Sequence, residues 1–130
     1  MTDSTQTNVD NQSTKTVLIV EDDPDIGPIL QQAFKDETSY QAFLVSDGFA
    51  ALKIITTISP HLFLIDHHLP GMDGLKLTEH LHATKDFEQV PIIMMSANLP
   101  QKEIKKRQLK SIEKPFDLNV LLQMVREILA

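Results

Sequence analysis

The sequence contains no cysteine, which excludes a disulfide framework and a metal site built from thiolates. It has no apolar run long enough to cross a bilayer, and residues 1–15 lack the basic start and apolar stretch of a secretory signal peptide. We therefore expect a cytoplasmic protein without membrane contact. Positive charge is also scarce, since 12 Lys and Arg residues stand against 18 Asp and Glu residues and leave a net charge of −6. This balance argues against general binding to nucleic acid.

With 130 residues, 42% of them hydrophobic, the chain is long enough for one domain with a core of ordinary size. Residues 1–15 are mostly polar and cannot bury enough apolar surface to offset the cost of ordering. We expect a disordered tail over residues 1–15 and a folded domain over residues 16–130. Residues 102–110 hold four lysines and one arginine beside a single glutamate. A solvated helix face explains this basic segment better than a partner-docking patch does.

Short apolar runs alternate with amphipathic stretches along residues 16–130, which is the pattern of strands and helices in an α/β domain. The runs are continuously apolar, as expected for a parallel sheet that helices cover on both faces. We therefore expect a doubly wound sheet. Its five strands are predicted at Thr16–Val20, Gln41–Val45, His61–Ile65, Pro91–Met95 and Ser111–Glu113.

Helices are expected between the strands, each beginning near a residue that can cap it or form a turn. The first should begin at Pro24 with Asp23 as its cap, and Pro28 within it should cost a hydrogen bond or a local bend. The clearest apolar stripes follow Asp23, Asp47-Gly48, Gly74 and Asp117.

Polar side chains stand at the carboxyl ends of four strands, and right-handed crossovers bring such ends to one edge of a parallel sheet. Glu21, Asp22 and Asp66 are carboxylates, which would repel one another and raise at least one pKa unless a hard cation joined them. Mg²⁺ prefers such oxygen ligands and is often held together with phosphate oxygens. With Ser96 and Lys114 as donors to those oxygens, the set predicts phosphoryl transfer to Asp66 as the nucleophile.

Four motifs occur in order along the chain: Val17–Asp23, Leu64–Asp66 with Leu69–Gly74, Ile92–Ala97 and Glu113–Phe116. Together they resemble the receiver domain of two-component response regulators, and the resemblance extends from Thr16 to Ala130. It implies a flavodoxin-like (βα)5 fold with strand order 2-1-3-4-5. It also implies a free-standing phosphoprotein that is not an enzyme in its own right and that does not contact nucleic acid directly.

The resemblance assigns a role to each residue of the predicted site. Asp66 would accept a phosphoryl group from a phosphohistidine on a sensor histidine kinase or a histidine phosphotransfer protein. Asp22, Asp66 and the backbone carbonyl of His68 would bind Mg²⁺, with Glu21 acting through water. Ser96 and Lys114 would then move onto the phosphoryl oxygens, and this shift would switch contacts with a downstream protein. A cis peptide bond between Lys114 and Pro115 would aim the lysine at the site.

The sequence departs from the family pattern between the fourth and fifth strands. Ser111 replaces the usual aromatic residue three positions before the lysine, and Leu109-Lys110 replaces a common Gly-Ala pair. The helix expected after Pro100 has a poor pattern, because Ile104 and Leu109 do not share a helical face. We therefore expect a short, atypical helix there and a changed route from phosphate to output surface. His68 and Asn98 take positions that tune phosphate lifetime in the family.

Three other functions remain open for this sequence. A receiver-like interaction module that works without phosphorylation fits the altered segment but not the complete set of acids, serine and lysine. A small phosphatase with an aspartyl nucleophile usually has a second Asp two positions on, where this chain has His68. A flavin-binding protein would need a phosphate loop rich in glycine and hydroxyls after the first strand, where this chain has Glu21–Asp23.

Two further metal sites are weaker predictions. His67 and His68 should point apart on an extended backbone and have no third zinc ligand at a suitable spacing. Asp73 lies in a turn-rich stretch that leads into a helix, so we interpret it as part of the turn.

Overall fold

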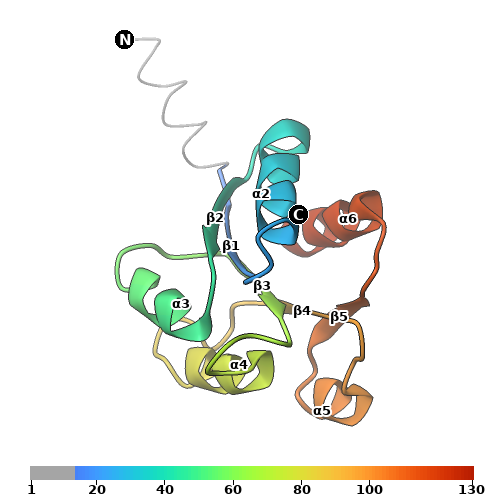
Figure 1. Ribbon diagram of the computed structural model, residues 1–130. Coiled ribbons are helices and arrows are strands. Elements are labelled where there is room, and N and C mark those ends of the chain that lie inside the picture. Colours follow the sequence, from blue (N-terminus) through green and yellow to red (C-terminus); the bar gives the residue numbers. More distant parts are fainter. Residues whose placement is uncertain (1–13) are drawn as a thin grey trace, which may run out of the picture.

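The computed structural model describes residues 14–130, so the predicted tail lies outside the described residues except for Thr14 and Lys15. The domain is built on one parallel sheet with strand order β2-β1-β3-β4-β5, which confirms the predicted order (Figure 1). Its strands are β1 (Thr16–Val20), β2 (Gln41–Val45), β3 (Leu62–Asp66), β4 (Ile92–Ser96) and β5 (Lys110–Glu113).

Helices cover both faces of the sheet, as expected for a doubly wound fold (Figure 1). One face packs against α2 and α6, and the other packs against α3, α4 and α5. The helices are α2 (Ile26–Glu37), α3 (Gly48–Ile54), α4 (Gly74–His82), α5 (Gln101–Lys106) and α6 (Leu118–Leu129). None of the helices within residues 14–130 has the length and apolarity that a bilayer crossing requires.

The central strands explain why the sequence showed continuous apolar runs. In β1, Val17 and Ile19 belong to the core layer under α2 and α6, whereas Leu18 and Val20 belong to the opposite layer. All four side chains are fully buried. Successive residues of a strand face opposite sides, so a strand covered on both sides needs an apolar residue at every position.

Strands β3 and β4 lie one residue further along the chain than predicted. The predicted start of β3, His61, uses its ring Nδ1 to accept a hydrogen bond from the backbone N–H of Thr16. Pro91 has no N–H to donate, and β4 begins at the next residue. As a result Asp66 and Ser96 are the last residues of their strands, where neighbouring backbones fix their position.

Helix α2 begins at Ile26, two residues later than predicted. Asp23 still caps the N-terminal end of α2, because its Oδ1 accepts hydrogen bonds from the N–H groups of Asp25 and Ile26 at 2.8 and 3.0 Å. Pro28 lies between Gly27 and Ile29, whose N–H groups donate to the carbonyls of Asp23 and Asp25 at 3.2 and 3.3 Å. Pro28 has no N–H for the bond between these two, so the predicted loss of a hydrogen bond is confirmed. The predicted cap Asp117 is confirmed, because it accepts a backbone N–H at the start of α6. Asp47, predicted only as part of a turn, also accepts a backbone N–H and caps α3.

Helix α5 is short, as the poor apolar pattern predicted. It has six residues, begins without a side-chain cap, and buries Ile104 alone. The chain leaves it through Gln108, which has a left-handed φ of 57°. Arg107 joins this segment to α4 through Nη2, which lies 2.9 Å from Glu79 Oε2 and 3.0 Å from Glu103 Oε1.

Candidate functional site

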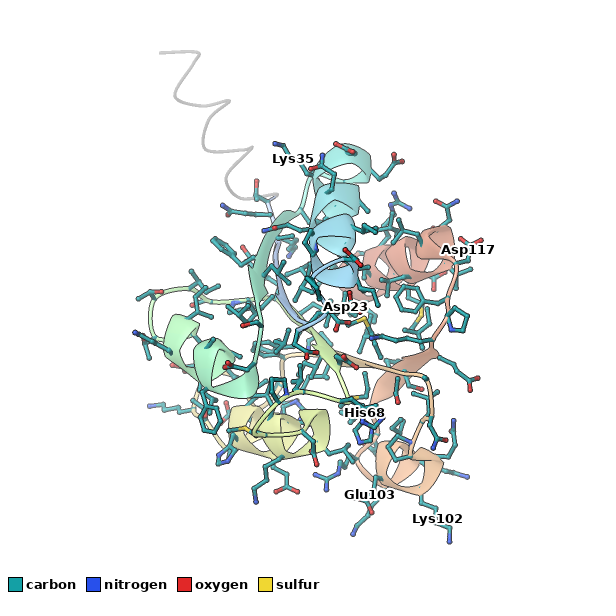
Figure 2. All side chains as sticks on the ribbon, viewed as in Figure 1. Asp23, Lys35, His68, Lys102, Glu103 and Asp117 are labelled. Atoms are coloured by element: carbon teal, nitrogen blue, oxygen red, sulfur yellow. The ribbon has the colours of Figure 1, made fainter. Side chains whose placement is uncertain are left out.

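Three carboxylates meet at the carboxyl end of the sheet. Strands β1 and β3 are neighbours, with Val20 paired to Ile65, so the residues that follow this pair lie side by side. Ligand oxygens of Glu21, Asp22 and Asp66 all lie within 4.8 Å of one another. Glu21 and Asp66 are buried, whereas Asp22 is exposed. The labelled residues that follow β1 and β3, Asp23 and His68, lie at this end of the sheet (Figure 2).

Lys114 brings a positive charge into this cluster from the end of β5. Its Nζ lies 2.8 Å from Glu21 Oε1 and 3.3 Å from Asp66 Oδ2. The backbone N–H of Lys114 donates to the carbonyl of Ser96 at 2.8 Å, which fixes the lysine beside β4. The peptide bond between Lys114 and Pro115 is cis, as expected.

Burial and the neighbouring charges shift two ionisable groups of the cluster. Burial raises the pKa of Glu21, and the nearby carboxylate of Asp66 raises it further, although the hydrogen bond from Lys114 acts in the opposite direction. Burial tends to lower the pKa of Lys114, but its hydrogen bond to Glu21 and the charge of Asp66 outweigh burial and raise it. The pKa of Glu21 is thus raised as expected, although burial contributes more to the rise than the crowding of carboxylates does. Lys114 stays protonated and offsets part of the negative charge.

The geometry of the three acids suits Mg²⁺. Octahedral Mg²⁺ holds oxygens at about 2.1 Å, which spaces ligand oxygens about 3 to 4.2 Å apart. The carboxylate oxygens of Glu21, Asp22 and Asp66 reach this spacing with small side-chain rotations, because they already lie within 4.8 Å of one another. Exposed Asp22 leaves the cluster open to water, and Mg²⁺ usually keeps several waters.

Ser96 and the loop after β4 lie next to Asp66. Asp66 pairs with Met95 across the β3–β4 ladder, and Ser96 is the next residue of β4. The Ser96 side chain is fully buried, and its Oγ accepts a hydrogen bond from the backbone N–H of Asn98 at 3.0 Å. This leaves the hydroxyl proton of Ser96 available as a donor.

The loop between β3 and α4 is closed tightly behind Asp66. The N–H of Gly74 donates to the carbonyl of His67 at 2.8 Å, and a Cβ at Gly74 would lie 2.5 Å from the carbonyl oxygen of Asp66. Only glycine fits at this position. The sequence interpretation missed this role, although glycine directly after a capping residue is the signal for it. Asp73 is that cap, since its Oδ1 accepts from Lys76 N–H at 2.8 Å, in agreement with its interpretation as a turn residue.

The two histidines after Asp66 do not point apart as predicted. Their ring centroids lie 4.6 Å apart, because the chain bends directly after β3. Burial and the neighbouring His68 lower the pKa of His67, and Nδ1 of His67 is buried without a hydrogen-bond partner among the described residues. Within residues 14–130 the histidines join no group of three ligating side chains, so the zinc interpretation gains no support. The N–H of His68 donates to Asp66 Oδ1 at 3.2 Å and steadies the acceptor.

An apolar groove that the sequence interpretation missed borders Lys114. It has a volume of about 380 Å³. Ile29 on its α2 side is 58% exposed. The groove is lined mainly by Ile26, Ile29, Leu30, Pro115, Phe116 and Leu118.

Comparisons with known proteins agree with this geometry. The chain matches the response regulator receiver domain over residues 17–126. It is 32% identical over 117 residues to sporulation initiation phosphotransferase F of Bacillus subtilis, covering 87% of this chain and 92% of that protein. It is 34% identical over 91 residues to the transcriptional regulatory protein BaeR of Escherichia coli O6:H1, covering 70% of this chain and 36% of BaeR.

A solved structure supports the same assignment. The receiver domain of a sensor histidine kinase from Pseudomonas aeruginosa PAO1 aligns with a TM-score of 0.79 and 25% identity, covering 89% of this chain and 98% of that one. That domain was solved with a magnesium ion coordinated in its active-site cleft. The fold, the match over residues 17–126 and these relatives agree. The chain therefore belongs to the response regulator receiver domains of two-component signalling.

Proposed function

We propose that this chain is a Mg²⁺-dependent phospho-acceptor, in which Asp66 receives a phosphoryl group from a phosphohistidine. The donor is a sensor histidine kinase or a histidine phosphotransfer protein in the cytoplasm. The observation that carries the proposal is the contact of Lys114 Nζ with both Glu21 and Asp66, above a cluster of three carboxylates. The phosphotransferase named among the relatives supports it.

The chemistry follows from the charges of the site. A carboxylate oxygen of Asp66 attacks phosphorus, the P–N bond breaks, and its electron pair stays on the imidazole nitrogen, which takes a proton from water. When bound to the acids, Mg²⁺ supplies positive charge for the phosphoryl oxygens. Lys114 and the hydroxyl of Ser96 donate hydrogen bonds to the same oxygens. The carbonyl of His68 and a water-bridged Glu21 complete the set of proposed metal contacts.

Phosphorylation would act on partners through the loop after β4. The Oγ of Ser96 accepts a hydrogen bond from the N–H of Asn98. Rotation of this hydroxyl toward a phosphoryl group would therefore alter the backbone position at the start of the segment that leads to α5. A downstream protein would recognise the changed segment. The apolar groove beside Lys114 gives a protein donor a surface to pack against, which a small phosphodonor does not need.

The other functions receive less support. An interaction module without phosphorylation has no use for a half-buried lysine shared by two buried acids. A phosphatase of this type usually has a second Asp as general acid two positions after the nucleophile, where this chain has His68.

Phosphorylation can be tested directly by intact mass. The protein is incubated with acetyl phosphate and MgCl₂, and one added phosphoryl group is expected. Asp66→Asn should abolish the gain, as should EDTA. Asp73→Asn is the matched control, because it changes a nearby aspartate to a residue that can still cap α4. No gain in the wild type, or an equal gain in Asp66→Asn, would overturn the proposal.

A further inference from the structure

Helix α3 contacts the loop that carries His68. The loop joins β3 to α4, and its outer part is the turn Pro70–Met72. Two successive residues of α3 touch this turn. A Cβ at Gly48 would lie 3.0 Å from Sδ of Met72, and a Cβ at Gly71 would lie 3.0 Å from Cε2 of Phe49. The first turn of α3 therefore lies directly against the turn.

The turn depends on a backbone conformation that glycine adopts easily. Gly71 has a φ of +79°, and the N–H of Met72 donates to the carbonyl of Pro70 at 2.9 Å. A hydrogen bond between residues two apart closes a γ-turn. Glycine reaches a positive φ without a steric penalty but loses more conformational freedom on folding than other residues, so contacts from outside the turn help to keep it in one conformation.

Phe49 is placed to hold this turn. Its side chain is 61% exposed and belongs to neither core cluster, so the core does not account for it. Single exposed apolar residues are common and need no special role. Phe49 differs because its ring edge lies on Gly71: Cε2, Cδ2 and Cζ lie 3.0, 3.8 and 4.0 Å from the position of a Cβ there. The ring thus covers the one residue of the turn that has a left-handed backbone.

The two ends of the loop are fixed independently of Phe49. Asp66 is paired within the sheet, the N–H of Gly74 donates to the carbonyl of His67, and Asp73 caps α4. Residues 68–72 lie between these anchors, and they include His68. The N–H of His68 is held by Oδ1 of Asp66, whereas its carbonyl is joined to the turn through Leu69, so a displacement of the turn can reach this carbonyl.

We propose that Phe49 is a positioning residue: its ring presses on Gly71 and holds residues 68–72 so that the carbonyl of His68 faces the acids. This rests on the proposed function, since the carbonyl matters only if the acids bind Mg²⁺. Residues that orient a metal ligand without touching the metal change affinity by about tenfold or more when altered. A similar effect is expected here.

The first test compares three variants of exposed residues. Phe49→Ala should raise the Mg²⁺ dissociation constant about tenfold in calorimetric titration and leave the thermal midpoint close to that of the wild type. Phe49→Tyr keeps the ring and should restore affinity. Val120→Ala is the matched control, because Val120 is 53% exposed on α6, far from the loop in the sequence, and should change nothing.

A second measurement needs no metal. Amide hydrogen exchange of Met72, whose N–H bonds within the turn, should be several-fold faster in Phe49→Ala than in the wild type, whereas exchange of Gly74, at the independently fixed end of the loop, should not change. If the wild type binds no Mg²⁺, the proposed function fails. If amide exchange in Phe49→Ala also equals that of the wild type, Phe49 does not hold the turn either. If the wild type binds Mg²⁺ but Phe49→Ala matches it in affinity and exchange, the positioning role alone is wrong.

A double-mutant cycle covers the case in which Phe49→Ala is too unstable to study. Gly71→Ala alone should suffer from both the positive φ and the ring of Phe49. Combined with Phe49→Leu, which shortens the side chain, Gly71→Ala should lower the midpoint less than the two single changes predict together. Strict additivity would show that ring and turn do not interact and would overturn the proposal.

Discussion

The ammonium nitrogen of Lys114 lies 3.3 Å from Oδ2 of Asp66, although the two residues come from strands separated by β4. The lysine is closer still to Glu21, at 2.8 Å. In this arrangement a protein cation already occupies part of the space in which the acids would hold a metal ion. Lys114 is thus a partner for an incoming phosphoryl group and also a competitor for the carboxylate of Glu21.

Replacing Lys114 should separate these two effects. Lys114→Ala removes one donor to the phosphoryl oxygens, and the rate of phosphorylation by acetyl phosphate should fall about 100-fold. Mg²⁺ affinity should be unchanged or higher, because Glu21 loses a competing cation. Lys110→Ala is the control, since it removes the same charge from an exposed position of β5. A large loss of Mg²⁺ affinity in Lys114→Ala would contradict the competition.

Gly74→Ala should displace the backbone of Asp66. The new Cβ would lie 2.5 Å from the carbonyl oxygen of Asp66 and 2.9 Å from Cα of His67, and backbone atoms cannot turn aside as a side chain can. We expect a loss of about 3 kcal/mol in the free energy of unfolding in urea, and slower phosphorylation. Gly27→Ala is the comparison, because its Cβ would press on the flexible end of Leu44 at 3.0 Å and would lie at an ordinary van der Waals distance, 3.6 Å, from the carbonyl oxygen of Glu21. Equal losses in both variants would refute this explanation.

Mg²⁺ should stabilise the folded protein. A ligand that binds only the folded state adds about 2.7 kcal/mol at 100 times its dissociation constant, so the thermal midpoint should rise with MgCl₂. Asp22→Asn should remove most of this rise, because it takes one carboxylate from the cluster. Asp25→Asn, which alters an exposed acid at the start of α2, should keep it. A rise that survives in Asp22→Asn would place the metal elsewhere.

The raised pKa of Glu21 predicts a pH dependence of stability in EDTA. As the pH falls from neutrality toward the ordinary value of 4.5, the folded protein takes up a proton at Glu21 before the unfolded chain does. The contribution of Glu21 to the free energy of unfolding therefore grows as the pH falls, is complete below 4.5, and is lost as the pH rises through the raised pKa. Urea unfolding should show the wild type gaining stability relative to Glu21→Gln over this range. A constant difference between the two would exclude the raised pKa.

The strand-end motifs were sufficient to predict the sheet order and the assembly of the acids with Lys114. Features set by neighbours in space were not predictable in the same way. The start of α2 depends on how Asp23 turns its carboxylate, and the contact between His67 and His68 depends on a bend after β3. The contact of Phe49 with Gly71 joins the first turn of α3 to a loop, and no local sequence pattern connects the two.

Helix α5 buries a single side chain, and this affects where a protease can cut the native protein and where substitutions are tolerated. A six-residue helix anchored by Ile104 and an exposed Arg107–Glu79 pair can open locally while the sheet stays intact. Within the folded residues 16–130, a protease should therefore cut first in the segment 97–109. The same segment can accept substitutions at little expense to the acceptor site, which makes it the part of the chain where new partner specificities can arise most readily.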